Sequence, residues 1–183
     1  MERIDRLTLN QPVTGLNLRP GTLGDQLTAP RTLVAFLRHL GCMFCREMVA
    51  DLHGLSAEPG FPPVLLVTQS TEEDLAAFLA TRWPEAQAIA DPDRCLYLAF
   101  DIARARSIGA MAGPAVWSCG MRALAKGHLQ IPGRPRPALG DPWLLSALFL
   151  LSPDGTTQWE YRAQHAGERP DYAGIPRGVR GEA

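Results

Sequence analysis

The sequence predicts an α/β fold in which helices flank a central mixed β-sheet. Near the start, an apolar run over residues 32–37 leads through a Gly turn into a helix that opens with Cys42-Met43-Phe44-Cys45, and a second strand and helix follow. Near the end, two strand-like runs flank the turn Pro153-Asp154-Gly155. The first pattern is a βαβ unit with parallel strands, and the second is an antiparallel hairpin. Together they predict one mixed sheet.

Length and composition indicate a single globular domain. The chain has 183 residues, enough to bury its own core. We expect one domain over residues 1–172 and a flexible tail over residues 173–183, which are rich in Gly, Pro and Arg. With 18 basic and 19 acidic residues, the formal net charge of -1 gives no reason to expect nucleic acid or an anionic membrane as a partner.

No segment of the sequence resembles a targeting or membrane-spanning element. Residues 1–6 alternate charged and apolar side chains and lack the apolar core of a signal peptide. The longest apolar run, Trp143 to Leu151, is interrupted only by Ser146 and is far shorter than the ~20 residues that span a bilayer. We therefore expect a cytoplasmic protein with no membrane partner.

The first elements place the two cysteines of the Cys-x-x-Cys differently. Residues 1–29 are mixed in character and predict an irregular arm with one short edge strand. After the strand over residues 32–37, a helix is predicted from about Cys42 to Leu55, with Cys45 at the edge of its apolar face. We expect Cys45 to be partly buried, and Cys42, at the helix tip, to lie closer to solvent.

The later elements complete the sheet and its helices. Val64–Thr68 predicts a second buried strand. Ser70-Thr71-Glu72-Glu73 has the form of a capping box, with Ser70 and Glu73 satisfying each other's free N–H groups, and it opens a helix that ends before Pro84. The remaining predictions are a strand at residues 88–90, a helix from 91 to 102, a helix from 118 to 126, an extended Pro/Arg loop at 131–137, and strands at 144–151 and 157–162.

A βαβ unit that begins just before a Cys-x-x-Cys, with a C-terminal hairpin, is typical of the thioredoxin-like fold. The free N–H groups and the dipole of a helix N-terminus stabilise thiolates, so Cys42 and Cys45 are the candidate redox site. A zinc site is the weaker interpretation, because zinc needs four ligands and Cys95 and Cys119 are not paired. We therefore expect no metal.

Three basic side chains flank the candidate dithiol. Arg38 and His39 end the first strand, and either could lower a thiol pKa electrostatically, although His39 is equally consistent with a structural role. Arg46 follows Cys45 and could stabilise a thiolate, but helical spacing points it away from the apolar face. A solvated surface arginine explains Arg46 equally well.

The other two cysteines are weaker candidates, because a free cysteine is usually a small buried hydrophobe. Cys119 lies near a predicted helix start and is the candidate for a resolving thiol, whereas Cys95 is expected to be a packed residue. Trp117 and Trp143 are expected to pack in the core rather than to line a substrate groove.

Three segments resemble one known family. Phe36-Leu37-Arg38-His39-Leu40-Gly41-Cys42-Met43-Phe44-Cys45-Arg46-Glu47 is similar to the signature of the peroxiredoxin-like 2 (selenoprotein L-like) branch of the alkyl hydroperoxide reductase/thiol-specific antioxidant (AhpC/TSA) family. Asp91-Pro92-Asp93-Arg94 with Leu96-Tyr97 resembles the segment leading into its next helix. Gly140-Asp141-Pro142, residues 149–155 and residues 161–170 resemble its C-terminal hairpin and tail.

The resemblance implies a thioredoxin fold and thiol-based redox activity, with a peroxide or disulfide substrate, a thiol reductant and no cofactor. In ordinary peroxiredoxins the peroxidatic thiol follows a Thr-x-x-Cys pattern; here Cys42 takes the Thr position and Cys45 the peroxidatic one. Arg38 stands about where the peroxiredoxin motif has a Pro. No Pro directly precedes the strand Ala147–Leu151, where thioredoxins place a cis-Pro.

The sequence therefore predicts a thiol oxidoreductase of the antioxidant class that cycles between a Cys42/Cys45 dithiol and its disulfide. Expected exposure favours Cys42 as the attacking thiol, the resemblance favours Cys45, and both are retained. The alternative is a non-catalytic thioredoxin-fold module that binds a protein partner through the loop at residues 131–137. The oligomeric state is open, with a homodimer as one arrangement.

Overall fold

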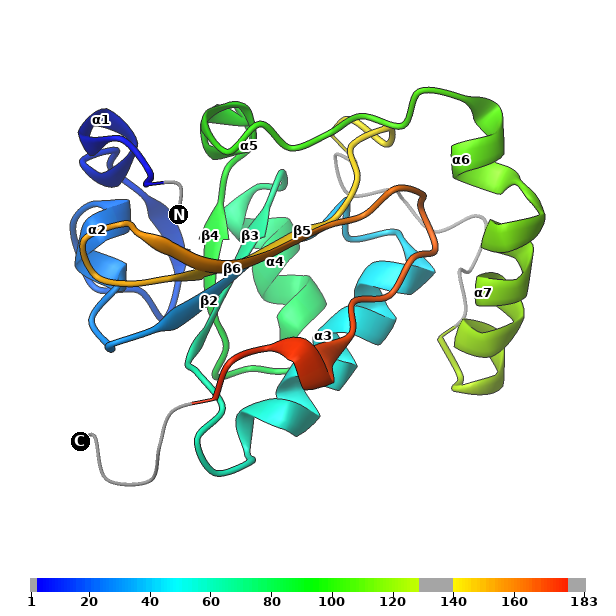
Figure 1. Ribbon diagram of the computed structural model, residues 1–183, viewed down its shortest axis with the longest axis horizontal. Helices are drawn as coiled ribbons and strands as arrows, with labels where there is room; N and C mark the ends of the chain where they lie inside the picture. Colours follow the sequence, from blue (N-terminus) through cyan, green and yellow to red (C-terminus); the bar gives the residue numbers. More distant parts are fainter. Residues whose placement is uncertain (1–2, 129–139, 178–183) are drawn as a thin grey trace.

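A six-stranded mixed sheet forms the centre of the computed structural model, which describes residues 3–128 and 140–177 (Figure 1). The strand order is β1-β4-β3-β2-β5-β6. The central strands β2, β3 and β4 run parallel, whereas β1, β5 and β6 are antiparallel to their neighbours. The strands are β1 (Thr14–Leu16), β2 (Thr32–Phe36), β3 (Val64–Thr68), β4 (Gln87–Ala90), β5 (Ala147–Leu151) and β6 (Thr157–Arg162).

Helices cover both faces of this sheet. The helices are α1 (Arg6–Leu9), α2 (Leu23–Gln26), α3 (Met43–Ser56), α4 (Glu72–Leu79), α5 (Cys95–Ala99), α6 (Ile108–Ala112), α7 (Pro114–Ala125) and the 3-10 helix η1 (Tyr172–Gly174). Side chains of α3 and α4 pack on one face of the sheet, and those of α2 and α5 pack on the other. Every residue of β2, β3 and β5 is buried, because these strands are covered on both faces.

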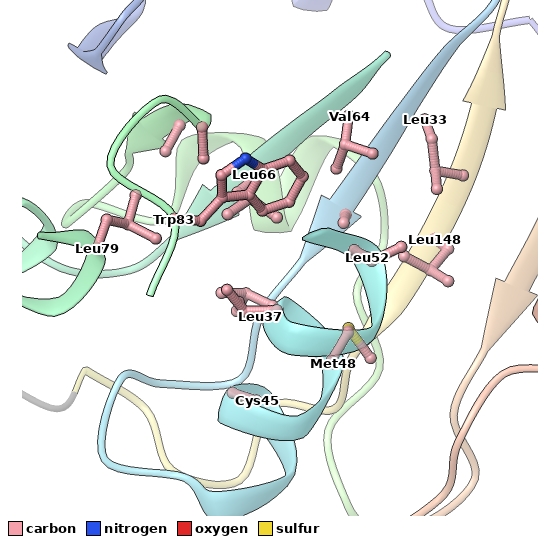
Figure 2. Close-up of a cluster of buried hydrophobic side chains, with 14 of the residues drawn as sticks. Leu33, Leu37, Cys45, Met48, Leu52, Val64, Leu66, Leu79, Trp83 and Leu148 are labelled. Atoms are coloured by element: carbon pink, nitrogen blue, oxygen red, sulfur yellow. The ribbon is translucent and has the colours of Figure 1, made fainter. Parts of the chain in front are cut away.

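The core on the α3 face reaches the redox motif. Figure 2 shows Cys45 on the first turn of α3 among the buried side chains of Leu37, Met48 and Leu52. The apolar stripe of α3 therefore anchors the helix to the sheet and fixes the position of the second cysteine of the motif.

The predicted α/β architecture is confirmed, and several boundaries differ. Strands Val64–Thr68 and Thr157–Arg162 lie where they were predicted, but β5 starts at Ala147 rather than at residue 144. The cap of α4 is Thr71, whose side chain accepts a hydrogen bond from the Asp74 backbone N–H, so the predicted pairing of Ser70 with Glu73 is wrong. Ser70 is instead buried and shares a hydrogen bond with Thr68.

Between α5 and residue 128 the structure has two helices where one, at residues 118–126, was predicted. Pro114 begins α7, since proline is well suited to the first turn of a helix, and α6 precedes it directly. Figure 1 shows α7 beside the N-terminal end of α3, with α6 packed against α7. Trp117 on α7 is 71% exposed, so the prediction that it packs in the core is wrong.

Residues 6–26 and 172–175, near the two ends of the described chain, form structure that the sequence did not indicate. The N-terminal arm contains two short helices as well as the edge strand β1. At the other end, Tyr172 and Ile175 are buried in the α3 face of the core, so the predicted tail boundary after residue 172 falls inside a packed segment. The loop predicted at residues 131–137 lies outside the described residues. Within the described ranges, no helix is long and apolar enough to cross a membrane.

Candidate active site

The dithiol lies where the chain leaves β2 and enters α3. The Cys42 backbone N–H donates to the His39 carbonyl at 3.1 Å, which closes a turn after the strand. Cys42 is the N-cap residue of α3, with extended backbone angles, and its carbonyl accepts the helical hydrogen bond of the Arg46 N–H at 3.2 Å. Its side chain therefore lies beside the free N–H groups of the first helical turn.

Both sulfurs are buried. Cys42 is 4% exposed and Cys45 is 1% exposed, so the prediction that Cys42 lies closer to solvent is wrong. The helical wheel placed Cys42 at the helix tip correctly, but it carried no information about what covers that tip. Cys42 belongs to the buried cluster on the α3 face, and the buried side chain of Arg38 also contacts its sulfur.

Arg38 contacts the dithiol directly. It is 3% exposed, and its Nη1 donates to the Cys42 Sγ at 3.2 Å. Its Nε donates to the Leu144 carbonyl at 2.9 Å, and its Nη2 donates to the Pro142 carbonyl at 2.7 Å. A buried guanidinium thus stands between the loop before β5 and the first cysteine.

The two cysteines have opposite acidities. The pKa of Cys42 is lowered to about 6, chiefly by a hydrogen bond from the Cys45 thiol and, against the opposing effect of burial, by the positive charge of Arg38. The backbone N–H groups of Phe44 and Cys45 lower it further. Burial, followed by the hydrogen bond and charge of Cys42, raises the pKa of Cys45 well above its usual value. At neutral pH the pair is a Cys42 thiolate beside a Cys45 thiol.

His39 and Arg46 are the other two basic residues predicted beside the dithiol, and their environments differ from that of Arg38. Burial, and then the charge of Arg38, lower the pKa of His39 to about 4, so its ring is neutral at neutral pH. The expectation that a charged His39 lowers a thiol pKa therefore does not hold there. Arg46 is partly buried, and burial, followed by the charge of Arg46, lowers the pKa of Arg82. A role for Arg46 beside the thiolate stays a prediction.

Sequence reasoning missed two residues that support the site. Gln69, directly after β3, is 3% exposed and bonds both Arg38 and Asp141 through its amide. The Tyr97 hydroxyl lies between the Leu37 and Val67 carbonyls and so connects the ends of β2 and β3 beneath the dithiol. Tyr97 and Asp141 lie in segments that carried the family resemblance, whereas no local pattern marks Gln69.

The remaining cysteines lie on other helices. Cys119 on α7 is partly buried and lies close to Gly167, as does the ring of Phe44 from the Cys-x-x-Cys insert. Its role as a resolving thiol stays a prediction. Cys95 is exposed at the start of α5, so the expectation that it is a packed residue is wrong. Within residues 3–128 and 140–177, no group of three or more His, Cys, Asp or Glu side chains is arranged to hold a metal.

The sheet order and a Cys-x-x-Cys at the start of α3 define a protein of the thioredoxin-like class with a peroxiredoxin-type fold. A mutant of peroxiredoxin Q from Xanthomonas campestris has a TM-score of 0.60 and 19% identity, over 88% of this chain and 85% of that one. The bacterioferritin comigratory protein of Xanthomonas campestris has a TM-score of 0.54 and 17% identity, again over 88% of this chain and 85% of that one. A mutant of Xylella fastidiosa PrxQ has a TM-score of 0.54 and 16% identity, over 89% of this chain and 84% of that one.

A family model matches the sequence as well. The model for the AhpC/TSA antioxidant enzyme matches residues 49–165, which is more than half of the chain. The chain therefore belongs to the AhpC/TSA antioxidant enzyme family. The matched segment begins four residues after Cys45, so the family assignment and the geometry of the dithiol are independent observations. No curated protein sequence matches the chain.

Proposed function

We propose that this protein is a thiol peroxidase in which Cys42 attacks the peroxide and Cys45 resolves the product. One observation carries the proposal: Arg38 Nη1 lies 3.2 Å from the Cys42 sulfur at the N-terminus of α3, and the Cys45 thiol is buried on the first turn of the same helix. Family membership supports a thiol-based redox role. Placement in the peroxiredoxin-like 2 branch is the finer proposal, and it rests on residues 36–47.

The proposed cycle has three steps. The Cys42 thiolate attacks one peroxide oxygen, the O–O bond breaks, and the other oxygen leaves as an alcohol or water after taking up a proton. Cys42 is then a sulfenic acid. The Cys45 thiol attacks this sulfur, water leaves, and a Cys42–Cys45 disulfide forms. Two external thiols then reduce the disulfide by exchange and are themselves oxidised to a disulfide.

The acidities of the pair suit this division of roles. A thiol with a pKa of about 6 is about nine-tenths ionised at pH 7, and the thiolate is the nucleophile. The protonated Cys45 carries the proton that leaves with the water in the second step. Because both sulfurs are buried, a small peroxide suits the site better than a protein disulfide. The resemblance would give the attacking role to Cys45, so the two assignments make different predictions.

The test is oxidation of the reduced full-length protein by hydrogen peroxide, followed by free-thiol titration and intact mass. We expect Cys42→Ser to abolish rapid oxidation at the dithiol. We expect Cys45→Ser to retain the first step and to accumulate a sulfenic acid on Cys42, which dimedone traps. Cys95→Ser is the matched control, since Cys95 is exposed and remote from the pair in sequence, and it should leave oxidation of the dithiol unchanged.

Two outcomes would contradict the proposal. A Cys42→Ser protein that still forms a sulfenic acid on Cys45 at the wild-type rate would reverse the roles. Unchanged oxidation rates in both variants would remove the dithiol as the reacting site.

A non-catalytic interaction module is the second candidate function, and one observation favours it. Trp117, Met121 and Leu124 follow one another at helical spacing on α7 and are 71%, 65% and 43% exposed. An inert dithiol in the peroxide experiment, together with a stable protein complex in pull-down, would favour this function over the peroxidase.

A further inference from the structure

Gln69 connects three segments that are far apart in the sequence. Its Nε2 donates to the backbone carbonyl of Arg38 and, at 2.9 Å, to that of Asp141. Its Oε1 accepts the Asp141 backbone N–H at 2.6 Å. The side chain is buried, so these bonds form away from competing water. One amide therefore fixes the end of β2 against the loop at residues 140–146.

The same loop holds the guanidinium of Arg38. The Pro142 and Leu144 carbonyls accept from its Nη2 and Nε, and this leaves Nη1 directed at the Cys42 sulfur. The loop is also tied through the Asp141 carboxylate, which pairs with Arg104 and, at 3.7 Å, with Arg94. A change in the loop would therefore move the acceptors that aim the guanidinium.

We propose that Gln69 is a positioning residue: its amide fixes the loop at residues 140–146, and the loop carbonyls in turn hold the Arg38 guanidinium against the Cys42 sulfur. Gln69 acts through Arg38 and touches no reacting atom. The inference rests on the proposed function, because it concerns the thiol to which that function gives the attacking role.

The physical basis is the fixed direction of a planar donor group. A guanidinium held within hydrogen-bonding distance of a sulfur favours its thiolate form, whereas one that turns away loses most of this effect. Groups behind a directly contacting residue set its orientation in this way at many sites. Gly140 shows how closely the amide is packed, because a Cβ at this left-handed position would overlap Gln69 Oε1.

Several other side chains lie near Arg38, the dithiol or the loop, and the test has to hold them constant. His39 and Cys45 flank Cys42 on its own segment, and Met111 on α6 contacts Arg38 at 3.6 Å. Burial, and then the charge of Cys45, raise the pKa of Tyr97 on α5. The charged groups across the loop are Asp141, Arg94 and Arg104.

The experiment is a pH titration of thiolate ultraviolet absorbance in the full chain, on a Cys95→Ser, Cys119→Ser background that leaves Cys42 as the acidic thiol. We expect Gln69→Met, which keeps the side-chain length and removes both polar atoms, to raise the pKa of Cys42 by roughly one unit. Gln26→Met is the matched control. Gln26 is also a buried glutamine that holds a loop, through the Arg19 and Thr22 carbonyls and the Arg19 N–H, but it is the last residue of α2.

A folded Gln69→Met protein with an unchanged Cys42 titration would overturn the inference, and so would an equal shift in Gln26→Met. If Gln69→Met does not fold, Gly140→Ala displaces the same amide without removing it, and it should raise the Cys42 pKa in the same direction. No change in that variant would also overturn the inference. The titration uses no peroxide, so a shift in a protein that fails to reduce peroxide would reject the proposed function and leave this inference standing.

Discussion

Arg38 and His39 are adjacent basic residues with different relations to the dithiol. Arg38 turns inward, satisfies its donors on loop carbonyls and places one N–H on the Cys42 sulfur. His39 is partly buried beside that cation, so its ring loses its proton at neutral pH. A guanidinium keeps its charge under the same conditions because its intrinsic pKa is far higher. The site therefore uses the arginine as its cation.

His39 gives a pH dependence of stability with a definite sign. Its folded-state pKa, about 4, lies below the ordinary value of 6.5, so the unfolded chain binds the proton first as pH falls. Stability is therefore lost between about pH 6.5 and 4. As pH falls from about 7 to 4.5, the free energy of unfolding should decrease by about 2–3 kcal/mol less in His39→Gln than in the wild type. Denaturant unfolding at the two pH values measures this difference. His53→Gln is the matched control, since it makes the same substitution at a half-exposed histidine on α3.

At the scale of elements, a buried carboxylate joins α3 to α7. Glu47, two residues after Cys45, accepts two hydrogen bonds from Arg122 at 3.0 and 3.1 Å and pairs with Lys126 at 3.0 Å. Burial opposes the charged form, but these two cations hold the pKa of Glu47 below its usual range. Only Val116 and Ala123 of α7 are buried, so polar contacts carry much of its attachment. This makes α7 a weakly attached element.

We expect Glu47→Gln to loosen α7 while leaving the sheet intact. The amide keeps one acceptor but loses the charge that pairs with two cations, at a cost of about 1–3 kcal/mol. Hydrogen exchange followed by mass spectrometry should show faster exchange over α7 and unchanged exchange in β2 and β3. Glu73→Gln, at an exposed position in α4, is the matched control. Equal protection of α7 in both variants would show that other contacts hold the helix.

At the scale of the whole molecule, the C-terminal segment closes the α3 face of the core. Ile175 is 2% exposed and Tyr172 is 7% exposed, and both join the cluster that contains Cys45 and Met48. In Figure 1 this segment crosses α3, although the two are far apart in the sequence. A residue beyond the predicted domain boundary therefore belongs to the packing that buries the second cysteine.

Ile175→Ala should test this closure. Removing a buried isoleucine side chain costs about 2–4 kcal/mol in the free energy of unfolding. Arg177→Ala removes an exposed ion pair with Glu58 and should cost less than about 1 kcal/mol. Thermal or denaturant unfolding measures both. Similar small losses in the two variants would mean that the segment lies on the core without stabilising it.

Much of the fold could be predicted from local patterns, because β2, β3 and α3 show their burial in their own periodicity. The position of the dithiol, and Arg38 as a basic residue beside it, could also be predicted from the sequence, because both depend on residues within one strand–turn–helix segment. The burial of Cys42 could not be predicted in this way, because it depends on tertiary packing in the α3-face cluster and against the Arg38 side chain. Gln69 was missed because its partners lie 31 and 72 residues away in sequence.

The sequence by itself determined that this chain forms a mixed α/β sheet with a dithiol at a helix N-terminus, since strand periodicity, turn residues and helix ends are local properties. Only the tertiary structure decided which sulfur is acidic. That property depends on burial and on the direction of one guanidinium, which loop carbonyls from the far end of the chain hold in place. Local sequence cannot encode such a direction, because its partners meet only after the sheet has assembled.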